Sequence, residues 1–261
     1  MKHCCIVTYG NAGSGKGTLL KKGLKPELGG HILGMGDHLR RHIKAETPFG
    51  KVVAPYVKKG ELVPDLESNC AFLNMFEKLH PDDQPLWLLY LDGVTRTASQ
   101  TATVVDKLRR TGYDTVYGLV IDTPTKVCRE RLIARAYSEG RDDDQCLEAI
   151  EQRLMDCERH YEAVVRGFYT FTDGVYQFPV TEMREEAPGI VQVMCTVMEN
   201  TLRPRRSQCE QFGDQYSRRD NVHAFVEETG RLQMAKNDPA RRFVRPGYDQ
   251  RWQAWDSTAV A

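Results

Sequence analysis

The sequence predicts an α/β fold in which helices cover both faces of a central five-stranded parallel sheet, giving three layers. Three observations predict it. Apolar runs alternate with helix-period segments, a glycine-rich turn joins the first apolar run to the first helix, and the run from Trp87 to Leu91 is apolar throughout. Because continuous apolar runs are typical of strands buried on both faces, we expect this strand to lie inside the sheet.

The expected elements follow the hydrophobic period along the chain. Short apolar runs predict strands at 3–9, 31–33, 86–91, 115–121 and 175–180. Segments of helical period predict helices at 15–24, 37–45, 48–59, 66–79, 98–111, 124–137, 144–168 and 187–201. We assign residues 1–202 to one domain and residues 203–261 to an arginine-rich C-terminal extension. In the extension we expect a helix at 222–235 and an extended stretch at 237–248.

Composition limits the classes of protein to consider. The 36 basic and 36 acidic residues cancel, so no overall charge attracts nucleic acid or an acidic membrane. The sequence has no run of 18 apolar residues and no signal-peptide pattern, which predicts a cytoplasmic protein without a membrane partner, and we expect a monomer. The eight cysteines form no C-x-x-C pair, so we expect reduced thiols and no structural metal.

One nine-residue segment carries the strongest chemical signal. The spacing G-x-x-x-x-G-K-[ST] follows the first expected strand and opens the first expected helix. Its residues are Gly10, Asn11, Ala12, Gly13, Ser14, Gly15, Lys16, Gly17 and Thr18. Glycines let successive backbone N–H groups face one anion, Lys16 reaches the outer phosphates, and Thr18 holds Mg²⁺. The segment predicts a P-loop fold that binds a nucleoside triphosphate; a flexible turn with a solvated lysine is the structural alternative.

Asp92 ends the apolar strand and precedes Gly93. In open α/β sheets ligands bind at the carboxyl ends of the strands, and the phosphate loop opens from that same edge. We therefore expect Asp92 to face the phosphates and to hold Mg²⁺, largely through water. The alternative is that Asp92 only ends the strand or caps the next helix.

Further motifs supply arginine, whose planar fork binds two oxygens of one phosphate. They are Gly36 to Arg40 (GDHLR), Gly60 to Asp65 (GELVPD), Asp92 to Gln100 (DGVTRTASQ), Arg131 to Arg135 (RLIAR) and Gly140 to Asp144 (GRDDD), followed by Arg153. In this order and spacing they resemble the nucleoside monophosphate kinases of the adenylate kinase and UMP/CMP kinase group, over about residues 1–202. The five residues between Arg135 and Arg141 resemble the short-lid type of this family.

The resemblance implies a two-nucleotide site. The acceptor monophosphate would be bound in an insert at about 36–65, and a short lid would lie at about 136–144. The expected acceptor contacts are Arg40, Leu62, Val63, Gly93, Arg96, Gln100, Arg141 and Arg153, with Gln100 on the base. On the donor side, Arg131 would stack on the adenine of ATP and Arg135 would contact its phosphates. The expected catalytic residues are Lys16, Arg96, Arg131, Arg141 and Arg153.

The activity implied by the resemblance is reversible transfer of the γ-phosphoryl group from Mg-ATP to a nucleoside monophosphate. Thr97 and Gln100 match the adenylate kinase pattern and favour AMP, whereas Met35 replaces a common threonine and keeps UMP and CMP open. In the structural alternative, Arg131 and Arg135 share a solvated helix face and Gln100 is an ordinary first-turn residue. A second hypothesis is a catalytically weak ATP-binding protein whose basic tail, residues 203–261, binds a protein partner or nucleic acid. Alternatively, the tail only packs against the domain.

Overall fold

A parallel sheet forms the middle of the molecule. The computed structural model describes residues 2–139, 146–202 and 233–235. Five parallel strands lie in the order β2-β3-β1-β4-β5. Their bounds are β1 (Cys4–Tyr9), β2 (His31–Gly34), β3 (Leu88–Asp92), β4 (Thr115–Asp122) and β5 (Gly174–Pro179). The predicted five-stranded parallel sheet is confirmed, and the fully apolar run contributes β3, which pairs with a strand on each side.

A sixth strand, β6 (Gln233–Ala235), pairs antiparallel with β5. The helix expected at 222–235 is therefore wrong for its last three residues, because their backbone pairs with the edge of β5 instead of with its own preceding turn. The extended stretch expected at 237–248 lies outside the described residues.

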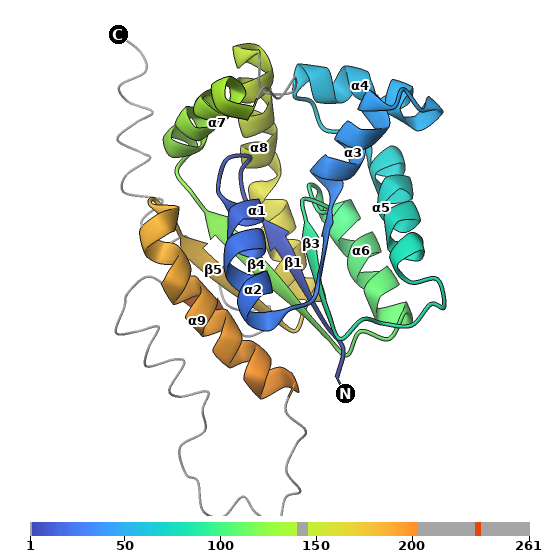
Figure 1. Ribbon diagram of the computed structural model, residues 1–261, viewed down its shortest axis with the longest axis vertical. Helices are drawn as coiled ribbons and strands as arrows, with labels where there is room; N and C mark the ends of the chain where they lie inside the picture. The colour runs from blue at the N-terminus through green and yellow to red at the C-terminus, as the bar shows by residue number, and fades with distance from the viewer. Residues whose placement is uncertain (1, 140–145, 203–232, 236–261) are drawn as a thin grey trace, which may run out of the picture.

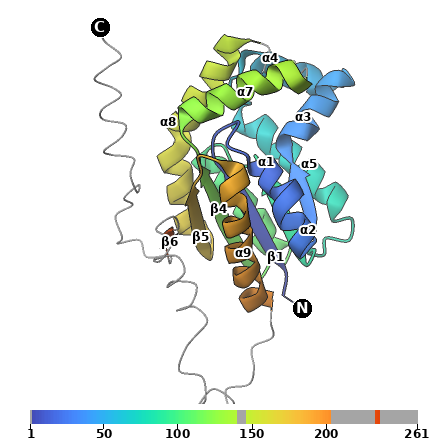
Figure 2. The ribbon, with the colours of Figure 1, turned by 60° about the vertical axis from the view of Figure 1, so that its left-hand side comes forward.

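Helices cover both faces of the sheet, as Figures 1 and 2 show. They are α1 (Lys16–Thr18), the π-helical η1 (Leu19–Leu24), α2 (Lys25–Leu28), α3 (Met35–Lys44), α4 (Pro48–Lys59), α5 (Asp65–Leu79), α6 (Ala98–Arg110), α7 (Thr125–Glu139), α8 (Leu147–Phe171) and α9 (Met183–Leu202). In Figure 1, α3 and α4 rise on one side of the carboxyl ends of the strands and α7 on the other.

The two faces of β1 belong to two separate parts of the core. Cys5, Val7 and Tyr9 pack in one cluster with residues of α5, α6 and α8. Cys4 and Ile6 pack in the other with η1 and α9. All six residues of β1 are buried, because a central parallel strand is covered on both sides. This packing fixes the end of β1, where the phosphate loop starts.

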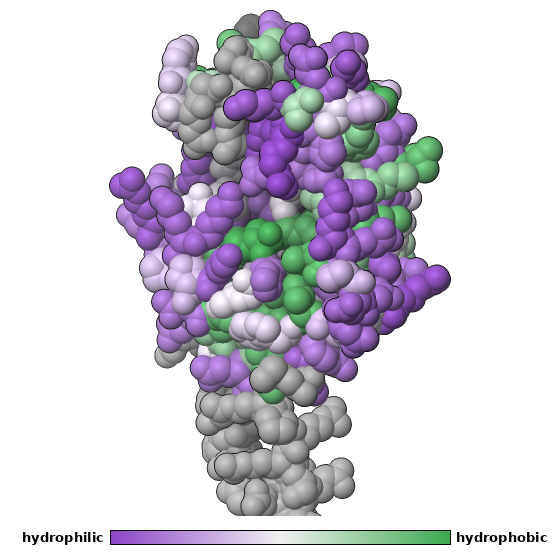
Figure 3. All heavy atoms as spheres, turned by 45° about the vertical axis from the view of Figure 1, so that its right-hand side comes forward, coloured by the Kyte–Doolittle hydropathy of each residue, from purple (hydrophilic) through white to green (hydrophobic). Residues whose placement is uncertain are grey.

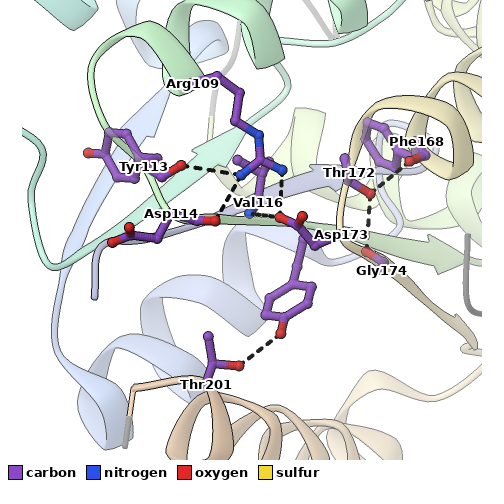
Figure 4. Close-up of polar contacts among 10 residues, drawn as sticks. Arg109, Tyr113, Asp114, Val116, Phe168, Thr172, Asp173, Gly174 and Thr201 are labelled. Atoms are coloured by element: carbon purple, nitrogen blue, oxygen red, sulfur yellow. Dashed lines mark hydrogen bonds and ion pairs between the residues drawn. The ribbon is translucent and has the colours of Figure 1, made fainter. Parts of the chain in front are cut away.

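At the amino ends of β4 and β5, Arg109 near the end of α6 contacts the chain that precedes each of these strands (Figure 4). Its Nη1 donates to the backbone oxygens of Tyr113 and Asp114, and its Nη2 donates to Asp173 at 2.6 Å. Asp173 also accepts from the backbone N–H of Val116 at 2.7 Å. These charged groups stabilise the fold at the end of the sheet away from the carboxyl ends of the strands.

Among the helices of the described residues, none has the length and apolar character needed to cross a membrane.

Candidate active site

A cavity of about 1000 Å³ opens at the carboxyl ends of β1 and β3. Its walls come from the phosphate loop, the starts of α3 and α9, the chain after α4, and the helices α7 and α8. On the face of the molecule turned forward in Figure 3, hydrophilic side chains surround a smaller apolar area. The position of the cavity agrees with the rule that open α/β sheets bind ligands outside the carboxyl ends of their strands.

The phosphate loop packs too closely for side chains at two of its glycines. A Cβ atom on Gly10 would lie 2.3 Å from the backbone oxygen of Ile121, and one on Gly13 would lie 2.6 Å from that of Cys128. Both glycines also have positive φ, 140° and 81°, a region that favours glycine. The loop is therefore fixed against the end of β4 and against α7. It continues directly into the helical segment from Lys16 to Leu28.

Lys16 is folded back onto the loop. Its Nζ donates to the backbone oxygens of Gly10 and Asn11, each at 2.7 Å, and to the hydroxyl of Ser14 at 3.1 Å. The residue is only 8% exposed, and burial lowers its pKa despite the opposing Asp92 carboxylate. These neutral acceptors hold the ammonium at the cavity wall, where phosphate oxygens would compete for it.

Asp92 and Thr18 place oxygen atoms on the same cavity. The Oδ1 atom of Asp92 lies 3.4 Å from the hydroxyl of Thr8 in the neighbouring strand. Its Oδ2 atom would lie 3.3 Å from a Cβ on Gly17, so the carboxylate stands beside the first helical turn. A carboxylate and a hydroxyl are the hard oxygen donors that Mg²⁺ prefers, so the residues fit that ion.

Arginines reach the cavity from several elements. Arg40, Arg96, Arg131, Arg135 and Arg153 all line it. The Nη2 of Arg40 donates to Asp37 at 2.6 Å, and Asp37 also pairs with Lys21 at 3.3 Å. The two cations hold the pKa of Asp37 below its ordinary value, although partial burial opposes them. The ion pair between Lys21 and Asp37 joins α3 to the helical segment that follows the phosphate loop.

Arg131 joins the phosphate loop to the start of α9. Its Nη1 donates to the backbone oxygen of Gly13 at 3.3 Å, and its Nη2 donates to that of Thr181 at 2.8 Å. Arg131 and Arg135, about one helical turn apart on α7, both line the cavity.

The chain after α4 forms one wall of the cavity through Gly60, Leu62 and Val63. The backbone N–H of Leu62 donates to Asp156 of α8 at 3.3 Å. Asp156 is 6% exposed and also accepts from Gln152 at 2.9 Å. A buried carboxylate thus fixes this wall, a contact between residues 94 positions apart that no local pattern predicts.

Gln100 lies on the cavity wall with both ends of its amide bonded. Its Oε1 accepts from the backbone N–H of Arg96 at 2.7 Å, and its Nε2 donates to Asp65 at 2.9 Å. Thr97 donates to the same carboxylate at 3.0 Å and also caps α6 by accepting from the backbone N–H of Gln100. The side chain is 1% exposed, so these bonds fix the orientation of its amide.

Comparison with known proteins agrees with this geometry. The family model described as adenylate kinase matches residues 8–173. An adenylate kinase of Parabacteroides distasonis is 34% identical over 149 residues, 57% of this chain and 75% of the relative. One from Synechococcus is 33% identical over 165 residues, covering 63% and 81%, and one from Thermus thermophilus is 30% identical over 176 residues, covering 65% and 88%. The chain belongs to the adenylate kinase family.

Family membership identifies the protein as a nucleoside monophosphate kinase, an enzyme that transfers phosphoryl groups between nucleotides. Most residues expected at the adenylate kinase site are gathered on the one cavity. They are Ala12, Gly13, Gly15, Lys16, Gly17, Thr18, Arg40, Leu62, Val63, Asp92, Gly93, Arg96, Gln100, Arg131, Arg135 and Arg153. Gly10, Asn11 and Ser14 lie behind this wall as hydrogen-bond acceptors of Lys16. Arg141 lies outside the described residues, as do positions 140–144 of the expected lid, whereas its positions 136–139 belong to the end of α7.

The start of α9 contributes site residues that the sequence analysis missed. We expected this helix to begin at 187, but it begins at Met183 and contains Pro188. Glu182, Met183 and Arg184 consequently line the cavity beside the loop that Arg131 contacts. The missed signal is the pair Glu185 and Glu186, since acidic residues favour the first turn of a helix.

Proposed function

We propose that this adenylate kinase family member uses AMP as its preferred acceptor, converting ATP and AMP reversibly to two molecules of ADP. The observation that supports this choice is the fixed amide of Gln100. Its Oε1 faces an N–H donor and its Nε2 faces a carboxylate, so the reversed orientation would lose both bonds. Only 1% of Gln100 is exposed, but the residue borders the cavity, and one Nε2 proton and one Oε1 lone pair have no further partner among the described residues. A base seated against this wall would meet them.

Those two groups complement a base that carries a ring-nitrogen acceptor beside an exocyclic amino donor. Adenine has this pattern at N1 and N6. Uracil and guanine place a ring N–H beside a carbonyl. In the same position as adenine, their ring N–H would face the Nε2–H of Gln100, and their carbonyl oxygen would face its Oε1. An unpaired buried polar group costs about 1–3 kcal/mol, so we expect AMP to be favoured over UMP by about tenfold to a hundredfold. Cytosine shares the pattern of adenine, which makes CMP the second candidate.

The residues of the cavity divide the work of transfer between them. The phosphate loop and Lys16 would hold the donor phosphates, with Arg131 on the adenine and Arg135 on the phosphates. Arg40 and Arg96 would hold the acceptor phosphate, and Arg153 would bridge both nucleotides. Arg141, which lies outside the described residues, would contact the phosphates. The acceptor oxygen is already anionic, so alignment and charge compensation carry the reaction and no covalent intermediate is needed.

Magnesium, held by Thr18 and through water by Asp92, would supply charge neutralisation on the phosphates. The roles of individual residues, the domain limit at 202, the cytoplasmic location and the monomeric state are predictions.

An acceptor panel tests the proposal. The purified protein is given Mg-ATP with AMP, CMP, UMP, GMP or dTMP, and diphosphate formation is followed by chromatography. We expect the highest kcat/KM with AMP, then CMP. UMP or GMP as the best acceptor would contradict the proposed base contact, and no diphosphate from any acceptor would contradict kinase activity altogether.

A further inference from the structure

Outside the cavity, a bidentate ion pair joins α7 and α8. The Nε and Nη2 groups of Arg129 donate to the two carboxylate oxygens of Glu151, the second at 2.8 Å. Hydrogen bonding to Glu151 holds the pKa of Arg129 above its ordinary value, so the guanidinium remains charged. A guanidinium and a carboxylate that share two parallel hydrogen bonds are fixed in orientation as well as in distance.

The pair lies on the side of the helices away from the cavity. Positions two apart on an α-helix are about 200° apart around its axis. Arg129 therefore points away from Arg131, and Glu151 points away from Arg153. The lining agrees, because Arg131, Arg135 and Arg153 line the cavity whereas Arg129 and Glu151 do not.

Little apolar packing fixes these two helices against each other. Among the described residues, one small buried cluster joins them, made of Cys128, Leu132, Ile150 and Leu154, with Ala12 of the phosphate loop and Ile133 of α7 packed against it. A second polar contact runs from the hydroxyl of Thr125 to Glu158 at 2.9 Å. Dispersion and burial resist separation but are not directional, whereas the ion pair sets the angle and the offset between the helices.

We propose that Arg129 and Glu151 are positioning residues, whose paired contact sets the spacing of Arg131 and Arg135 on α7 relative to Arg153 on α8. This inference rests on the proposed roles of those three arginines in binding the two nucleotides. Displacement of about 1 Å in a reacting constellation can cost about a hundredfold in rate. Neither residue touches the substrates; each acts through the helix that carries it.

A charge swap tests the proposal in the full chain. The variants are Arg129→Glu, Glu151→Arg and the double variant that carries both. The measurements are kcat and KM for ATP and AMP, the Kd of ATP without acceptor by calorimetry, and Tm. The matched control is Glu148→Arg, which makes the same charge change one turn earlier on α8, at an exposed position outside the pair.

We expect each single variant to lose about tenfold to a hundredfold in kcat/KM for ATP and to bind ATP more weakly. The double variant should return to within about threefold of the unsubstituted protein, because the pair is rebuilt with reversed polarity and unchanged net charge. Glu148→Arg should change these constants by less than about threefold. Arg129→Lys keeps the charge but cannot make the bidentate pair, so its kcat/KM should lie between those of the single variants and of the unsubstituted protein.

Two results would overturn the inference. One is single variants that lower Tm while leaving kcat and the Kd of ATP unchanged, which would show a purely structural pair. The other is single variants that fail and a double variant that does not recover. A protein that phosphorylates no monophosphate would contradict the proposed function instead, and the calorimetric Kd of ATP would still decide whether the pair positions the arginines.

Discussion

Gly60 gives the strongest test of how packing places the acceptor wall. It ends α4 with φ at 74° and lines the cavity just before Leu62 and Val63. A Cβ at this position would lie 1.9 Å from the backbone oxygen of Ala149 in α8, whereas real Cβ atoms essentially never come closer than 3.0 Å. In Gly60→Ala, α4 and α8 must therefore separate by about 1 Å, because both sides of the contact are backbone.

The expected cost has two parts. Overpacking contributes about 1–3 kcal/mol and the left-handed conformation about 1–2 kcal/mol. Together they should lower Tm by roughly 5–15 °C in a domain of this size. Since a displacement of about 1 Å can cost about a hundredfold, kcat/KM for AMP should fall by about that factor, while ATP binding changes by less than about threefold.

The assay measures KM and kcat for each nucleotide at saturating levels of the other, at a temperature well below the Tm of the variant. Gly189→Ala in α9 is the control, because no atom lies within 4 Å of its added Cβ. The control should keep normal kinetics and gain about 0.5–1 kcal/mol from helix propensity. Equal weakening of ATP and AMP, or unchanged AMP kinetics in Gly60→Ala, would refute the argument that this contact places the acceptor wall.

Three other predictions concern single residues. Arg96→Ala should cut kcat/KM for AMP by on the order of a thousandfold in steady-state kinetics, since charge on the acceptor phosphate loses its partner; an unchanged rate would reject that role. Asp65→Ala should release the amide of Gln100 and raise KM for AMP. The ratio of kcat/KM for AMP to that for UMP should then fall in the acceptor panel, whereas an unaltered ratio would show that Asp65 does not set selectivity. Burial, with the nearby charges of His42, Arg41 and Lys78, lowers the pKa of His38 to about 4. The unfolded chain, with a pKa near 6.5, binds this proton more tightly, so the free energy of unfolding should fall by up to about 1.4 kcal/mol per pH unit between pH 6.5 and 4. Urea unfolding at pH 7 and pH 5 checks this, and His38→Gln should flatten the dependence.

The elements were predictable because their signals are local. Each strand of the parallel sheet is a short apolar run, and the phosphate loop is a spacing within nine residues. The helix expected at 48–59 begins at Pro48 and ends at Lys59, just before Gly60. Proline favours the first position of a helix and glycine the position after its end. The start of α9 was missed because Pro188 is expected near a helix start, yet it lies inside the helix.

The contacts that fix the site were not predictable, because they join distant parts of the chain. Asp156 meets Leu62 only after α8 packs beside the chain that follows α4. Asp65 meets Gln100 only where the starts of α5 and α6 come together. The spacing of motifs indicated which residues bind nucleotides, whereas the residues that hold them in place depend on tertiary packing.

In the proposed reaction, one cavity holds a donor and an acceptor nucleotide, and the phosphoryl group passes directly between them. Transfer of label from [γ-³²P]ATP tests it most directly. With AMP present, we expect the label to appear in ADP at its β-phosphate, at a rate that Arg96→Ala greatly reduces. Label released only as inorganic phosphate, whether or not AMP is present, would contradict it.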